Sequence, residues 1–432
     1  MVTNTLKRDL GVLDAVLLGL GSILGTGIFV SIGLAAGIAG GFVVVAIVIA
    51  AMVATLNALS SAQLAAAHPV SGGTYEYGYH FLHPIFGFMA GWMFVVAKSA
   101  SAATAALGFA GYLLAFLGYS RGAIVWVAVA VVILVTIVVL AGARRSNHMN
   151  SVVVGFTLFA LVCFTAAGFR YGWAGSGAAH GETLSAVRVT PAALLHASAL
   201  MFVAYAGYGR IATMAEEVRD PRRTIPRAII ATLSVSALLY ILVSWAGVRA
   251  VGAEFLAQAT EGRAAPLEVA AQEFGVPFLP AIVAIGAATA MLGVLLNLVL
   301  GLSRVYLAMG RRRDMPVLLA RVDAQGRTPW PAVLVTGAVI LMLTLIGSVK
   351  TTWSFSAFTV LVYYAITNLA ALRIPEADRL FPRWIPAGGL IAWLGLAFWV
   401  EPRVWLAGLV IGGIGLVWFA IAGGVKRAGG GA

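Results

Sequence analysis

Apolar stretches long enough to cross a lipid bilayer run through the whole chain, and they restrict its fold more than any other feature. Of 432 residues, 61% are hydrophobic and only 10% are charged, whereas soluble domains carry about 25% charge. A transmembrane helix needs roughly 17 or more apolar residues. Stretches of this kind are predicted at 12–36, 40–67, 84–117, 122–142, 149–170, 193–215, 227–249, 276–308, 330–348, 352–372, 385–400 and 404–424. The sequence therefore predicts an all-α integral membrane protein with twelve transmembrane helices.

The excess of basic residues follows the predicted topology. Loops on the side of the N-terminus hold eighteen of the 28 lysines and arginines, and the opposite loops hold seven. Cytoplasmic loops carry such an excess, so both termini (1–11 and 425–432) are expected in the cytoplasm and the protein in the cytoplasmic membrane. The net charge of +12 is thus a topology signal, and we expect membrane lipid rather than nucleic acid as a partner. Cys163 is the only cysteine, which excludes a disulfide-rich fold.

Glycine is concentrated at the centre of the first and the sixth stretches. The first contains GLGSILGTGIF, with four glycines in nine residues, and the sixth contains VAYAGYGR. Glycine costs about 1 kcal/mol in a helix relative to alanine, so both helices are expected to break, although close packing of small residues is an alternative. Broken helices at these positions indicate an inverted five-plus-five repeat. Its parts would be 12–170 and 193–372, followed by two additional helices in 385–424.

A break of this kind suits an amino acid as ligand. A half-helix that starts near Gly25, Thr26 and Gly27 would direct N–H groups and a positive dipole end at a carboxylate. Carbonyl groups around Ile23 and in the sixth stretch could accept hydrogen bonds from an ammonium group. Backbone alone could therefore hold both charged ends of a zwitterion.

These motifs resemble those of the amino acid–polyamine–organocation superfamily, bacterial amino acid permease branch. The resemblance covers nearly the whole chain. It rests on GSILGTGIF, PVSGGTY (69–75), VAYAGYGR, AEEVRDPRRTIPRA (215–228) and LSRVYLAMGRRRDMP (302–316). It implies a secondary active transporter that moves amino acids by alternating access, with a proton or sodium ion as coupling ion or by exchange.

The resemblance also implies the substrate-binding residues. Those matched on the first and sixth helices are Ile23, Gly25, Thr26, Gly27, Phe202, Val203, Tyr205 and Ala206. Relatives often carry an aromatic residue at the place of Val203, so either Phe202 or Val203 could act as the gate. At the foot of the sixth stretch, the residues expected in the cytoplasmic gate are Glu216, Glu217, Arg219 and Asp220; a solvated interface anchor is the alternative.

Lys98 is the most deeply placed ionisable residue in the predicted spans. A lysine there costs several kcal/mol unless it faces a polar interior or loses its proton. We therefore consider it a candidate for proton coupling, with a structural ammonium bound to carbonyls of a broken helix, or a snorkelling lysine, as alternatives. The lack of a central carboxylate, and Gly209 where many relatives carry an acid, favour a neutral amino acid as substrate.

Other classes of function find less support in the sequence. A polyamine, organic-amine or cationic amino acid transporter would need acidic residues around its pocket. A membrane-embedded enzyme would need catalytic groups at a shared depth, and none is evident. The histidines show no metal-ligand spacing, so neither a metal site nor a cofactor is predicted.

Overall fold

Helices make up most of the chain that the structure describes. The computed structural model describes residues 10–70, 72–119, 121–142, 147–173, 189–213, 218–323 and 328–429. In these ranges there is no β-strand, and an isolated β-bridge pairs Leu10 with Val218. The all-α prediction is confirmed for these residues.

Eight helical segments within these ranges are long and apolar enough to span a membrane. They comprise α2 (Ile32–Ala39) and α3 (Val43–Ala67) with the turns beside them, α5 (Pro84–Phe116), α7 (Asn147–Trp173), α9 (Pro191–Tyr205) with α10 (Gly209–Thr213), α11 (Pro221–Val251), α14 (Leu279–Arg311), α16 (Val349–Leu372) and α18 (Pro402–Gly429). Shorter apolar helices are α1 (Val12–Ile23), α6 (Ile124–Leu140), α15 (Trp330–Thr344) and α17 (Trp384–Ala397). A helix thus lies in each predicted stretch, and the chain is a multi-pass membrane protein.

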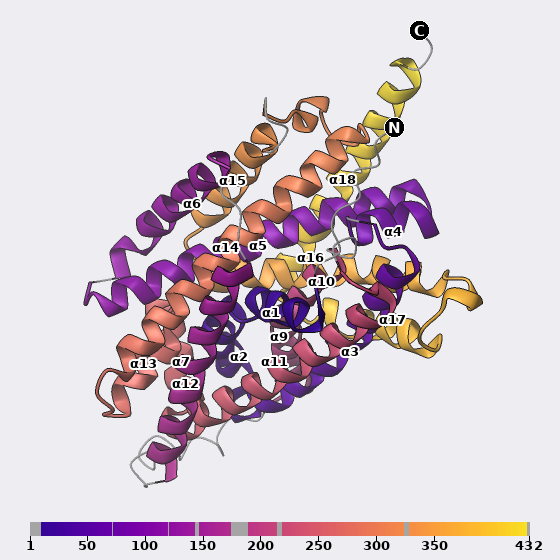
Figure 1. The fold of residues 1–432 in the computed structure, drawn as a ribbon. Helices are drawn as coiled ribbons and strands as arrows, with labels where there is room; N and C mark the ends of the chain where they lie inside the picture. Colours follow the sequence, from indigo (N-terminus) through magenta and orange to yellow (C-terminus); the bar gives the residue numbers. More distant parts are fainter. Residues whose placement is uncertain are drawn as a thin grey trace.

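Two long helices, α5 and α14, pack against each other in the middle of the molecule, and α16 packs on α5 (Figure 1). The centre of α5 reads AKSASAATAALGFAG, from Ala97 to Gly111. Small side chains let membrane helices approach closely, which explains why this helix can contact so many neighbours. These three helices form the support on which the broken helices rest.

The first predicted interruption lies between α1 and α2 (Ile32–Ala39). Helix α1 ends at Ile23, Leu24 and Gly25 are not helical, and the chain resumes through the π-helical turn η1 (Gly27–Ser31). The N–H groups of Ile28 and Phe29 both donate to the carbonyl oxygen of Gly25, at 3.1 Å each. Gly25 therefore begins the second limb of this helix.

The second interruption is a tightening of the helix rather than a gap. After Tyr205 the chain winds as the 3₁₀ turn η5 (Ala206–Tyr208) before α10 begins. At this turn Gly207 lies against α1 so closely that a Cβ atom would be 2.4 Å from the carbonyl oxygen of Ser22. The two interruptions therefore cross at a point where only glycine fits.

A short helical hairpin lies in the loop after α11. It consists of α12 (Ala253–Arg263) and α13 (Pro266–Glu273), joined at Ala264, which has φ 55°. Helix α12 packs on α2, and α13 packs on η1 and α5. In Figure 1 the hairpin lies at the lower left, and α4 (Thr74–Phe81) lies at the upper right, at the opposite end of the molecule.

Replacing Gly207 with alanine should lower the thermal stability of the protein. The added Cβ would lie 2.4 Å from the Ser22 carbonyl oxygen and 2.7 Å from Cγ1 of Ile23, and overpacking of this kind costs about 1–3 kcal/mol. Gly209→Ala is the matched control, because its Cβ would meet the Tyr364 hydroxyl at 3.4 Å. Thermal unfolding of the purified variants measures the difference, and equal stabilities would contradict the close crossing.

Candidate functional site

A cavity of about 480 Å³ lies where the two interrupted helices cross. Helix α1 and the start of the second limb line it with Ser22, Ile23, Thr26 and Gly27. From the sixth helix, α9 and η5 line it with Val203, Ala204, Ala206 and Gly207. Cavities of roughly 300–1,000 Å³ hold small organic ligands, so the site has the size for one.

The remaining walls come from α5, α14 and α16. Lys98, Asn297, Trp353 and Tyr364 line the central part. The cavity also reaches Tyr75 of α4 and Arg304 and Arg311 near the C-terminal end of α14, where both arginines are exposed. It therefore extends towards the α4 end of the molecule.

Hydrogen-bonded contacts close the site towards the α12–α13 hairpin. The hydroxyl of Tyr112 donates to the carbonyl oxygen of Phe29 at 2.6 Å and accepts from the N–H of Leu267 on α13 at 3.3 Å. All three residues are fully buried. The second limb of the broken helix is thus attached to α5 and to the hairpin at this end.

Side-chain donors satisfy the carbonyl groups released at the two interruptions. The Tyr240 hydroxyl on α11 lies 3.1 Å from the Ile23 carbonyl oxygen and 3.0 Å from that of Ala204. The Ala206 carbonyl oxygen accepts from the Tyr364 hydroxyl at 3.2 Å and from Nζ of Lys98 at 3.4 Å. A buried carbonyl needs such a partner, so these residues hold the interruptions open.

The second limb of the first interrupted helix begins beside the cavity. The initial N–H groups of a helix have no acceptor within it, and Thr26 and Gly27 border the cavity at this position. The Thr26 hydroxyl oxygen is buried and has no hydrogen-bond partner among the described residues. The start of the second limb and the turn of the sixth helix therefore border the same space.

The structure brings most, but not all, of the predicted binding residues to the cavity. Those that line it are Ile23, Thr26, Gly27, Val203 and Ala206, and the proton-coupling candidate Lys98 lines it as well. The other three pack behind it: Gly25 lies against Val294, the ring of Phe202 meets Tyr364 edge-on at 5.6 Å, and the ring of Tyr205 lies 4.9 Å from Tyr240. Of the two gate candidates, Val203 borders the cavity.

Several lining residues carry signals that the sequence analysis passed over. Asn297 is an amide within an apolar stretch of α14, and the pair Tyr363 and Tyr364 interrupts an apolar stretch of α16. Trp353 borders the cavity with its ring, and its Nε1 donates to the Leu200 carbonyl oxygen at 3.0 Å. Polar and aromatic side chains inside an apolar span are usable signals, although they do not identify the partner.

Of the predicted cytoplasmic gate, Glu216 and Glu217 lie outside the described residues. The backbone N–H of Arg219 donates to the Leu10 carbonyl oxygen at 3.0 Å. Asp220 forms an exposed ion pair with Arg223 at 3.8 Å. Across the described ranges, no group of three or more His, Cys, Asp and Glu side chains could hold a metal ion.

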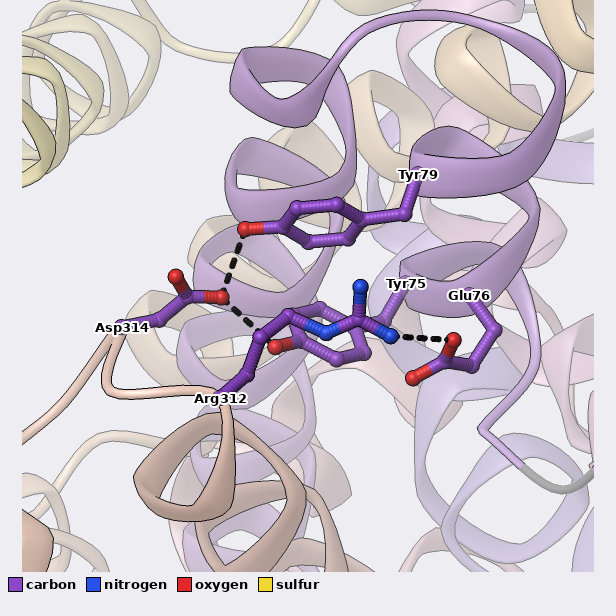
Figure 2. Close-up of polar contacts among 5 residues, drawn as sticks. All are labelled: Tyr75, Glu76, Tyr79, Arg312 and Asp314. Carbon is purple, nitrogen blue, oxygen red and sulfur yellow. Dashed lines mark hydrogen bonds and ion pairs between the residues drawn. The ribbon is translucent and has the colours of Figure 1, made fainter. Parts of the chain in front are cut away.

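A second polar cluster lies at the α4 end of the cavity (Figure 2). The hydroxyls of Tyr75 and Tyr79 both donate to Oδ2 of Asp314, at 2.6 Å each, and Asp314 is fully buried. Arg312 lies over both rings and pairs with Glu76 at 2.6 Å. Burial and the hydrogen bond to Asp314 raise the pKa of both tyrosines, so their hydroxyls stay protonated donors. The cluster fixes α4 to the chain after α14.

Removing one donor of this cluster should destabilise the protein. We expect Tyr79→Phe to lower the free energy of unfolding by about 1.5–3 kcal/mol, since it removes a hydrogen bond to a charged group. In an Asp314→Asn background the same change should cost less, because the charged acceptor is absent. A double-mutant cycle on thermal unfolding measures the coupling, and a coupling near zero would contradict the arrangement in Figure 2.

A multi-pass helical protein with a solute-sized cavity between two interrupted helices has the architecture of a small-molecule carrier. The sequence profile of the family described as "Amino acid permease" matches residues 14–426. The chain therefore belongs to this family.

Curated relatives agree with this assignment. An uncharacterized transporter of Mycobacterium tuberculosis is 42% identical, over 97% of this chain and 92% of its own length. The branched-chain amino acid permease BcaP of Bacillus subtilis is 27% identical, over 91% of this chain and 86% of its own. The serine/threonine exchanger SteT of Bacillus subtilis is 26% identical, over 87% and 85% respectively. The names of these relatives are those of transporters.

Proposed function

We propose that this permease carries neutral amino acids across the cytoplasmic membrane by alternating access. The observation that carries the proposal is the cavity at the crossing of the two interrupted helices, which Thr26 and Gly27 line from the first helix and Ala206 lines from the sixth. Thr26 and Gly27 would hold the substrate carboxylate. The carbonyl region around Ala206 would hold its ammonium group.

Alternating access requires two bodies that can move against each other, and the repeat supplies them. We propose twelve spans, with repeats in 12–170 and 193–372 and two further helices in 385–424. Contacts between counterpart helices support this: α3 packs on α11, α5 on α14, α6 on α15, and α1 on η5. Each helix of the first half named here meets its partner five spans later.

The orientation follows from the distribution of charge. The α4 end would be cytoplasmic, since the arginines at the end of α14 lie there and cytoplasmic loops are rich in basic residues. The cavity, which extends towards this end, would then face the cytoplasm. The segment that contains Glu216, Glu217, Arg219 and Asp220 would close it on this side.

The lining of the cavity favours a neutral substrate over a cationic one. Among the described residues, the lining includes Lys98, Arg210, Arg304 and Arg311 but no Asp or Glu. A cationic side chain would lose several kcal/mol on leaving water without a carboxylate to meet it. The names of BcaP and SteT denote branched-chain amino acids, serine and threonine, whose side chains are uncharged.

Competition for uptake tests this assignment directly. In proteoliposomes, excess unlabelled alanine, leucine or serine should suppress uptake of labelled leucine or alanine, and arginine should not. Thermal stabilisation by the same amino acids gives an independent measure, because a ligand of the native state raises stability by RT ln(1 + [L]/Kd). Strong competition by arginine or glutamate alone would overturn the neutral assignment, and no stabilisation by any amino acid would overturn the function.

Lys98 is our candidate for proton coupling, because its ammonium group donates to the Ala206 carbonyl oxygen at the interruption. Loss of this proton would weaken the hydrogen bond to the Ala206 carbonyl oxygen and remove a positive charge beside the place of the substrate ammonium. We expect Lys98→Met to retain exchange but to lose accumulation driven by a proton gradient. Lys350→Met is the control, since Lys350 forms exposed ion pairs with Glu261 and Glu401 at 3.9 and 3.7 Å. Full gradient-driven accumulation by Lys98→Met would assign Lys98 a structural role.

A further inference from the structure

Glu268 is a buried carboxylate in the α12–α13 hairpin, away from the central cavity. It is 2% exposed, and its Oε1 accepts from Nε2 of Gln272 at 2.6 Å. Its other oxygen, Oε2, is buried and has no hydrogen-bond partner among the described residues. An ionised carboxylate in such a place is costly, whereas a protonated one is not.

The surroundings of Glu268 offer little compensation for a negative charge. Two charged or titratable groups from the elements packed on α13 act on Glu268. They are Arg263 of α12, which is exposed, and Tyr112 of α5. Burial raises the pKa of Glu268, and the hydrogen bond from Gln272 and the charge of Arg263 lower the pKa by less. Loss of solvent thus outweighs both.

The hairpin is wedged so tightly into its neighbours that it must move if this end of the molecule opens. A Cβ atom on Gly33 of α2 would lie within contact of Oγ1 of Thr260, and one on Gly111 of α5 would lie 2.3 Å from the Arg263 carbonyl oxygen. The residue after Pro266, Leu267, is hydrogen-bonded to the Tyr112 hydroxyl. Opening this end would break these contacts and expose Glu268 to water.

From this geometry we infer that Glu268 is a proton-binding site that controls the hairpin: the closed hairpin holds it protonated, and its loss of a proton favours opening. The inference rests on the proposed alternating access. The raised pKa fixes the sign: the closed state binds the proton more tightly than the open state. Closure is therefore favoured at low pH and weakened as pH rises through the raised pKa.

A cysteine reporter tests the inference in the full-length protein. With Cys163 replaced by alanine, Thr260→Cys places a thiol where the closed hairpin buries it, since Thr260 is 1% exposed. Maleimide labelling in nanodiscs is compared with the same reporter carrying Glu268→Gln, which mimics the protonated carboxyl. At each pH, the labelling rate of the reporter with Glu268 is divided by that of the reporter with Glu268→Gln. This ratio cancels the titration of the thiol itself.

We expect this ratio to be near one at pH 5 and to rise at least about threefold by pH 8, because only the wild-type carboxylate opens the hairpin. Glu254→Gln is the matched control: Glu254 on α12 accepts from Gln258 in the same spacing, at 2.9 Å, but is exposed. It should label like the wild type at every pH. Gln272→Leu, which removes the donor to Oε1, should move the transition to higher pH.

A ratio that is the same at pH 5 and pH 8 would overturn the inference, as would a Gln272→Leu transition at unchanged or lower pH. If Glu268→Gln does not fold, the labelling rate of the reporter carrying Gln272→Leu is divided by that of the reporter alone at each pH. This ratio should fall below one between the two transitions, and a ratio of one throughout would overturn the inference. Failure of the proposed function is recognised separately. In that case no amino acid would stabilise the protein or change the labelling of Thr260→Cys, whatever the pH dependence.

Discussion

The need to pair every carbonyl group inside a membrane controls the architecture of this site. Lipid offers no hydrogen-bond donor, so an interrupted helix is stable only where protein or enclosed water replaces the missing partners. The Tyr240 hydroxyl meets this need at Ile23 and Ala204, one carbonyl from each interruption. Lys98 and Tyr364 do so at Ala206. These donors belong to α5, α11 and α16, and none of these three helices contains an interruption. Neighbouring helices thus stabilise the irregular backbone beside the cavity.

This division explains what the sequence could and could not predict. The glycines from Gly19 to Gly27 act locally, through the cost of glycine in a helix, and so the first interruption was predictable at Gly25. The second was predictable in place but not in form, since a 3₁₀ turn depends on the close approach of Gly207 to α1. Tyr240 lies more than thirty residues from the nearer carbonyl that it meets. No local pattern identifies such a partner.

Burial was the other quantity that sequence patterns did not provide. Glu254 and Glu268 each precede a glutamine by four residues on a short helix and form the same side-chain hydrogen bond. Glu254 is exposed, whereas Glu268 is buried within the packing of α13. For the same reason, the sequence does not distinguish Val203, which lines the cavity, from Phe202, which packs on Tyr364. Identity of residue type and spacing therefore leaves the environment undetermined, and the environment decides the chemistry.

The cluster around Asp314 also has a consequence for the order in which the protein is assembled. Its tyrosines on α4 are separated from Asp314 by 239 and 235 residues, and the Asp314 carbonyl oxygen accepts from Nε1 of Trp418, a further 104 residues along. At about 5–20 residues per second, α4 leaves the ribosome on the order of ten seconds or more before its partner. During synthesis the first half of the chain must therefore remain in the membrane with this end unfastened. Only the arrival of α18, the last helix, completes the connection.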